Sequence, residues 1–81
     1  MNSKGTIVCL PSRYEHVRYI SNSLIAGNDI VLVLTKVEGK VAKRILEYIC
    51  GTAYGLNGYM YKIDDKIYMF SRQSDIEAEV D

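Results

Sequence analysis

The chain has 81 residues, 48% of them hydrophobic, with ten basic and ten acidic side chains. This length allows one domain with one core, and the hydrophobic fraction excludes a chain that is disordered as a whole. A net charge of zero argues against broad binding to nucleic-acid phosphates, and two cysteines with one histidine are too few for a structural zinc site.

The small size and the uneven charge both bear on partners. A lone core of this size is marginal, so we expect a homo-oligomer. Residues 1–74 carry ten Lys/Arg and six Asp/Glu, a net charge of +4, whereas residues 75–81 carry four acids and no base. The basic body therefore favours an acidic peptide over a nucleic acid as partner.

The chain contains no apolar run long enough to span a bilayer and no signal peptide. We therefore expect a cytoplasmic protein. In that compartment Cys9 and Cys50 are expected to be buried thiols, with a disulfide or a redox pair as the alternative.

The first half of the chain predicts a strand, a helix and a second strand. Residues 6–10 form a short, β-branched apolar run. Ser12 and Glu15 have the spacing of a capping box, so a helix is expected from there to Gly27. Residues 30–34 are all apolar, which is typical of a central strand covered on both faces. The three elements predict a βαβ unit with parallel strands.

The second half predicts a helix over residues 38–54 and a hairpin with strands at 59–63 and 66–71. Residues 76–80 alternate apolar and acidic side chains, which predicts an exposed edge strand. The expected fold is one α/β (α+β) two-layer domain over residues 1–81. Its two helices pack on a mixed, roughly five-stranded sheet in the order β-α-β-α-β-β-β.

The aromatic residues of the hairpin suggest a binding surface. A two-residue loop of Asp64 and Asp65 would place four aromatic side chains on one face, namely Tyr59, Tyr61, Tyr68 and Phe70. Met60, Lys62, Ile67 and Met69 would then share the other face. Because two helices cover only one face of a sheet, an apolar face is expected to stay open as an interface, unless the domain buries both faces internally. We expect Tyr59, Tyr61 and Phe70 to form an exposed aromatic face.

No group of residues predicts catalysis or a cofactor site. His16, the only histidine, is expected to face solvent on the polar side of the first helix, and Ser12 is used as its cap. Gly51, Gly55 and Gly58 match neither a dinucleotide fingerprint nor a P-loop. We therefore expect a protein that is not an enzyme and that needs no metal or cofactor.

Gly51 lies within the second predicted helix, where glycine costs about 1 kcal/mol relative to alanine. It falls on the stripe that also carries Arg44 and Glu47, away from the apolar arc. Such a glycine allows another backbone to approach closely, which predicts self-association through this stripe. The alternative is that the helix ends or kinks near Gly51.

The segment RILEYICGTAYGLNG at residues 44–58, followed by KIDDKIYMFS at residues 62–71, resembles the core of the SepF family. The similarity extends over nearly the whole chain, and the tyrosine-rich version is more similar to archaeal members. Glu47 and Tyr48 stand where the family has Asp-Phe. Arg72 replaces the proline after the hairpin, which leaves the path into the last strand open.

The resemblance implies a cell-division adaptor with a dimeric core. Such an adaptor binds the C-terminal tail of FtsZ, polymerises in some members, and is recruited to the membrane at the division site by an amphipathic N-terminal helix. That helix is absent from this sequence. The resemblance places peptide binding at Lys62 and Tyr68 and self-association at Gly51, although the expected hairpin register puts Lys62 and Tyr68 on opposite faces. A small nucleic-acid-binding domain that uses the aromatic hairpin, and a regulatory enzyme subunit, remain as alternatives.

Overall fold

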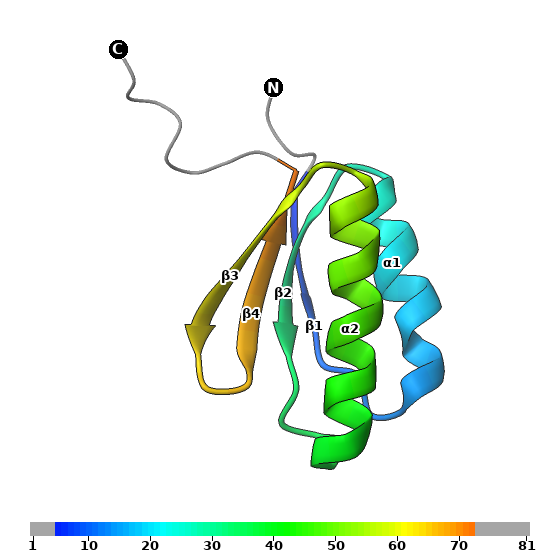
Figure 1. Ribbon diagram of the computed structural model, residues 1–81, viewed down its shortest axis with the longest axis vertical. Helices are drawn as coiled ribbons and strands as arrows, with labels where there is room; N and C mark the ends of the chain where they lie inside the picture. Colours follow the sequence, from blue (N-terminus) through cyan, green and yellow to red (C-terminus); the bar gives the residue numbers. More distant parts are fainter. Residues whose placement is uncertain (1–4, 73–81) are drawn as a thin grey trace.

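The computed structural model describes residues 5–72, which form a two-layer α/β domain (Figure 1). The elements are β1 (Thr6–Cys9), the 3-10 turn η1 (Tyr14–His16), α1 (Val17–Ile25), β2 (Asp29–Val33), α2 (Gly39–Gly55), β3 (Tyr59–Asp64) and β4 (Ile67–Ser71). Both helices lie on one face of the sheet, and no described element covers the other face. The predicted two-layer class is confirmed, with four strands. The predicted strand at residues 76–80 lies outside the described residues.

The sheet has the strand order β1-β2-β4-β3. β1 and β2 are parallel and are joined through α1, as the βαβ pattern predicts. β2 then pairs antiparallel with β4, and β4 pairs with β3 in the hairpin. The last strand of the described chain therefore lies beside the second, and β1 and β3 form the two edges.

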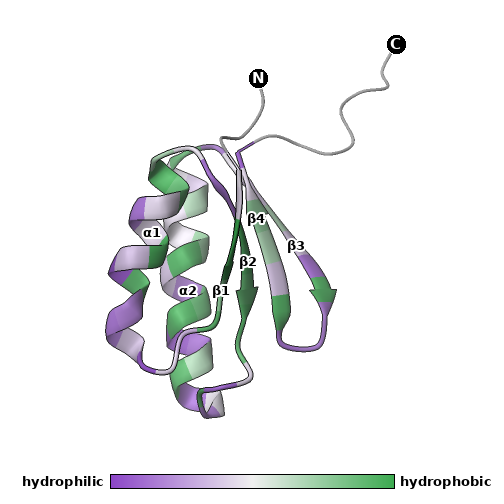
Figure 2. Ribbon diagram, turned by 180° about the vertical axis from the view of Figure 1, so that it is seen from behind, coloured by the Kyte–Doolittle hydropathy of each residue, from purple (hydrophilic) through white to green (hydrophobic). Residues whose placement is uncertain are grey.

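The core lies between the sheet and the helices. Ile30 and Leu32 of β2 and Phe70 of β4 are fully buried beneath the helices. The helices contribute side chains at steps of three and four residues, which is the spacing of one helical face. These buried helical residues are Val17, Ile20, Leu24, Ile45, Ile49 and Ala53. Figure 2 shows the hydrophobic residues running along β1 and β2.

The prediction that residues 30–34 are covered on both faces is wrong within one chain. Ile30 and Leu32 are covered by the helices, but Val31 and Val33 point to the opposite face and are only half-buried. Alternate side chains of a strand point to opposite faces, and this chain supplies a covering layer on one side only.

The predicted capping box at Ser12 is also wrong. The first helix begins as the turn η1, its N-cap residue is Arg13, and no side chain caps it. Instead the backbone N–H of Ser12 donates to Nδ1 of His16, at 3.2 Å. The histidine side chain therefore accepts the bond at this helix start. His16 is exposed, as predicted.

The connection from α2 to β3 is a tight turn. Asn57 has a φ of 59°, and a methyl group at Gly58 would lie 2.7 Å from the carbonyl oxygen of Ser71. This close approach requires glycine at position 58. It holds the end of α2 against the end of β4.

Candidate functional site

Lys62 and Tyr68 lie directly opposite each other in the hairpin, with paired Cα positions. They therefore share one face, and it is the helix-facing side, because Tyr68 also pairs with the buried Leu32. Lys62 is exposed at the sheet edge, while Tyr68 is half-buried.

The predicted hairpin register is wrong by one residue. Asp64 pairs with Ile67, so the turn consists of Asp65 and Lys66, and Lys66 takes a positive φ of 63°. The register shifts between Lys62 and Asp64. Such an irregularity turns side chains to the other face, because side chains alternate along a strand. The shift brings Lys62 and Tyr68 together.

The predicted register would have placed the four aromatic side chains of the hairpin on one face. In the structure they do not share a face. Phe70 is fully buried under the helices, so its predicted exposure is wrong. Tyr61 pairs with Met69 and faces away from the helices, while Tyr59, 44% exposed, lies two residues before it on the same side. The predicted aromatic face is thus divided between the two sides of the sheet.

Met60 extends the surface formed by Lys62 and Tyr68. It pairs with Phe70, lies on the same helix-facing side, and is 43% exposed although apolar. β3 is an edge strand of the sheet and has a neighbouring strand, β4, on one side only (Figure 1). We call Met60, Lys62 and Tyr68 the hairpin site. It combines one ammonium group with apolar surface, which suits a short peptide with a carboxylate and an apolar side chain.

The face of the sheet away from the helices forms a second candidate surface. One row of directly paired residues crosses the sheet from β1 to β3, in the order Val8, Val31, Met69 and Tyr61. Val33 and Ile67 form a second pair on the same face. We call these residues the open face: Val8, Val31, Val33, Tyr61, Ile67 and Met69. Val8 is 58% exposed, and the others are half-buried. The apolar run at residues 30–34 was the signal for this surface.

The predicted self-association residues lie on α2. Gly51 is exposed inside the helix, which continues to Gly55, so the alternative of a helix end at Gly51 is wrong. A methyl group at Gly51 would meet nothing within 4 Å. Arg44 is engaged within the domain, because its guanidinium carbon lies 4.1 Å from the ring centroid of Tyr14. Glu47 is exposed.

The cysteines of the described chain are free and have the properties of unreactive thiols. Burial raises the pKa of the Cys9 thiol. Burial, and then the nearby charge of Glu47, raise the pKa of Cys50. Both groups are therefore protonated near neutral pH, which makes them poor nucleophiles. Within residues 5–72 no cluster of His, Cys, Asp and Glu could hold a metal ion.

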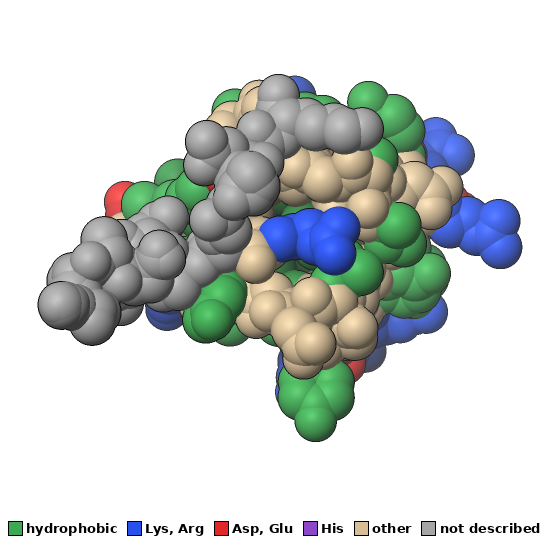
Figure 3. All heavy atoms as spheres, turned by 90° about the horizontal axis from the view of Figure 1, so that it is seen from above, with side chains coloured by type: hydrophobic (Ala, Val, Ile, Leu, Met, Phe, Trp, Pro, Cys, Tyr) green, Lys and Arg blue, Asp and Glu red, His purple; other side chains and the backbone are tan. Residues whose placement is uncertain are grey.

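The described part of the chain is mildly basic. Residues 5–72 carry nine Lys or Arg side chains and six Asp or Glu side chains, a net charge of +3. Lys and Arg side chains project from the helical side when the domain is seen from above (Figure 3). Among these residues no helix has the length and apolar character needed to cross a bilayer.

Comparison with known proteins identifies relatives along almost the entire chain. A family profile described as Cell division protein SepF matches residues 7–74. The chain is 34% identical over 74 residues to the Cell division protein SepF of Carboxydothermus hydrogenoformans, a match that covers 91% of this chain and 54% of the relative. It is 35% identical over 75 residues to that of Heliobacterium modesticaldum, covering 91% of this chain and 46% of the relative. The chain thus spans about half the length of these curated relatives.

Proposed function

The chain belongs to the SepF family of cell division proteins, and from this we propose that it is the core of a division adaptor. In this proposal two copies form a homodimer that binds the C-terminal tail of FtsZ. SepF is a family of non-enzymatic proteins, so this function consists of binding.

We propose that the open face forms the dimer interface. The support is in β2: Val31 and Val33 are as apolar as their buried neighbours, yet no described element of the chain covers them. A strand that is apolar on both sides is typical of sheets covered on both faces. A second copy can supply the missing layer, because a two-fold axis places the same patch on both partners.

Light scattering on the 81-residue chain tests the dimer. The expected result is twice the mass of one chain at tens of micromolar protein. A mass of one chain at that concentration would contradict the proposal, irrespective of any peptide binding.

We propose that the FtsZ tail binds at the hairpin site. The supporting observation is the pairing of Lys62 with Tyr68 on one face, beside the exposed Met60. In this arrangement the Lys62 ammonium group binds a carboxylate of the tail, and Met60 and Tyr68 contact an apolar side chain. The side chains of Lys62 and Met60 are not needed for the hydrophobic core, since Lys62 is exposed and Met60 is 43% exposed.

Calorimetric titration with a synthetic FtsZ tail peptide tests this site. We expect binding in the range of about 1 to 100 μM, weakened by Lys62→Ala and unchanged by Lys66→Ala, because Lys66 lies in the hairpin turn. Absence of binding at high micromolar peptide would contradict the proposal. RNA binding with a steep dependence on salt would instead favour a nucleic-acid-binding domain.

Further assembly is proposed to use the exposed side of α2. Gly51 leaves open space at the helix surface, and Glu47 and Arg44 flank it one and two turns earlier. Because Arg44 stacks on Tyr14, its contribution is to hold this surface rigid. Attachment at the division site requires an amphipathic helix from outside residues 5–72, and the protein acts on the cytoplasmic side of the membrane.

A further inference from the structure

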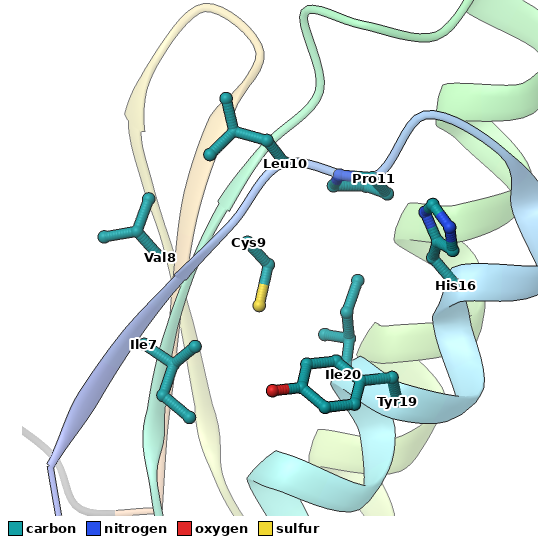
Figure 4. A pocket seen from close by; sticks show the side chains of 8 residues that line it. All are labelled: Ile7, Val8, Cys9, Leu10, Pro11, His16, Tyr19 and Ile20. Atoms are coloured by element: carbon teal, nitrogen blue, oxygen red, sulfur yellow. The ribbon is translucent and has the colours of Figure 1, made fainter.

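Helix α2 has one side that faces the hairpin and another that faces α1. Thr52 marks the side toward α1, because the hydroxyl oxygens of Ser21 and Thr52 lie 3.0 Å apart. α1 itself lies over β1, where Ile7, Cys9 and Ile20 line a pocket between the two elements (Figure 4). Because β3 is the opposite edge of the sheet, the side of α2 that points away from Thr52 faces the hairpin.

Three residues lie on this side of α2. Successive residues of a helix are about 100° apart around its axis, so Lys43, Leu46 and Cys50 lie between about 120° and 180° from Thr52. Lys43 is exposed, whereas Leu46 and Cys50 are half-buried and pack against the edge of the core. We call Lys43, Leu46 and Cys50 the α2 flank.

The turn after α2 allows positions on the helix to be compared with positions on β3. The Gly58 amide donates to the carbonyl oxygen of Ala53 at 2.7 Å, which fixes the two elements together at this point. α2 runs toward the turn and β3 runs back from it (Figure 1). A helix advances about 1.5 Å per residue and a strand about 3.3 Å, so the distance from the turn gives the level of each side chain.

By this measure the α2 flank lies level with the hairpin site. Met60 lies about 7 Å from the turn, between the levels of Cys50 at about 5 Å and Leu46 at about 11 Å. Lys62 lies about 13 Å from the turn, between the levels of Leu46 and of Lys43, which is at about 15 Å. The two lysines therefore share one end of a surface whose other end is mostly apolar.

The charges also differ between the two ends of this surface. Burial raises the pKa of the Cys50 thiol, and the charge of Glu47 raises it further, so the field of an acid reaches the apolar end. The ammonium groups of Lys43 and Lys62 lie at the other end. A peptide carboxylate is therefore favoured at the lysine end and disfavoured beside Cys50.

We propose that the α2 flank completes the hairpin site, so that the FtsZ tail lies along the surface between α2 and β3 in one direction only. Two carboxylates of the tail bind Lys43 and Lys62, and an apolar side chain next to them contacts Leu46, Cys50 and Met60. Lys43 is thus a second specificity-determining residue. The inference rests on the proposed binding of the FtsZ tail and adds the requirement for a pair of acids in that tail.

Calorimetric titration of charge-reversal variants with the synthetic FtsZ tail peptide tests the role of Lys43. Lys43→Glu should weaken binding at least about tenfold, because it replaces an attraction with a repulsion. The matched control Arg18→Glu changes the net charge equally on the exposed side of α1, and should change the affinity less than about twofold. Unchanged far-UV circular dichroism shows that both variants are folded.

Two further measurements test the pair of acids and the apolar contact. With a tail peptide whose Asp and Glu residues are replaced by Asn and Gln, the two variants should bind with equal affinity. In NMR titration with the original peptide, the signals of Leu46 and Cys50 should shift, while those of Ser21 and Thr52 on the α1 side should stay in place.

The possible failures of the inference and of the proposed function are distinguishable. Peptide binding that responds equally to Lys43→Glu and Arg18→Glu would overturn the inference and leave the hairpin site intact. Shifts confined to β3 and β4, with none at Leu46 and Cys50, would overturn it in the same way. Absence of any binding to the unchanged chain would refute the proposed function, and the inference with it.

Discussion

The two faces of the sheet are built from the same strands but have different surroundings. On β2, Ile30 and Leu32 are fully buried by the helices, while Val31 and Val33 are half-buried on the open face. The sequence of β2 does not distinguish the two sets, since all are apolar. Burial of a strand residue therefore depends on whether the chain supplies a second layer, which an apolar strand pattern alone does not reveal.

The largest expected difference between the faces is in the stability of the single chain. Ile30→Ala removes a fully buried side chain and should lower the free energy of unfolding by about 2 to 5 kcal/mol. Val31→Ala, on the open face, should cost less than about 1 kcal/mol in protein dilute enough to be monomeric. Urea denaturation of both variants at low concentration measures the difference. Equal losses would mean that the two faces are covered alike.

A charge on the open face should affect assembly more than folding. Val31→Lys would place an ammonium group in the proposed interface, which costs several kcal/mol if it stays unpaired. We expect the dimer to dissociate in light scattering, with the far-UV circular dichroism unchanged. The control is Thr35→Lys, an exposed residue outside the strands. A dimer that persists in Val31→Lys would assign self-association to the helical side.

The hairpin site lies at the border of the covered face. Within it, Tyr68 should contribute more to the affinity for the FtsZ tail peptide than Lys62 does. Tyr68→Ala should weaken binding of the FtsZ tail peptide by about 2 kcal/mol, because a half-buried aromatic anchor is lost. Tyr59→Ala removes a tyrosine from the other side of the hairpin and should change peptide affinity little. Calorimetry with both variants measures this difference. Equal losses would place the peptide across both faces.

The helical side permits a test in which stability and assembly change in opposite directions. Gly51→Ala fills open space and should raise the free energy of unfolding by up to about 1 kcal/mol, because alanine favours a helix. The same methyl group would obstruct a close approach by another copy, so assemblies larger than the dimer should decrease in sedimentation velocity. Unchanged sedimentation would exclude Gly51 from the contact.

The smallest effect concerns Cys9 on the covered face. Burial raises the pKa of its thiol in the folded chain, so the stabilising contribution is complete below the ordinary thiol pKa of 9.0 and is lost as the pH rises through the folded value. Thermal unfolding should show stability falling at alkaline pH. Replacing Cys9 with alanine should reduce this dependence, whereas Ser12→Ala should not.

The elements of the fold were predictable because their signals are local. The apolar steps of three and four residues in α2 and the apolar run in β2 each define an element without knowledge of the rest. The hairpin register was not predictable in the same way. Two acids at Asp64 and Asp65 favour a turn at those positions, but the turn formed one residue later, with Lys66 at positive φ.

The candidate site was predictable only in part, for the same reason. The resemblance to SepF selected Lys62 and Tyr68, and the structure places them opposite each other. Sequence reasoning missed Met60, because the expected register put it on a face without the aromatic side chains. It also misassigned Phe70, since the identity of an aromatic residue does not show which face the helices cover.

The strand order β1-β2-β4-β3 has a consequence for synthesis on the ribosome. β1, α1 and β2 emerge first, yet the second edge of β2 pairs with β4, which is made after all the other elements of residues 5–72. Until residue 71 leaves the exit tunnel, the nascent chain presents an unpaired apolar strand, a hazard for aggregation between neighbouring chains on one messenger. Closing the sheet and shielding this strand therefore have to wait for the synthesis of β4.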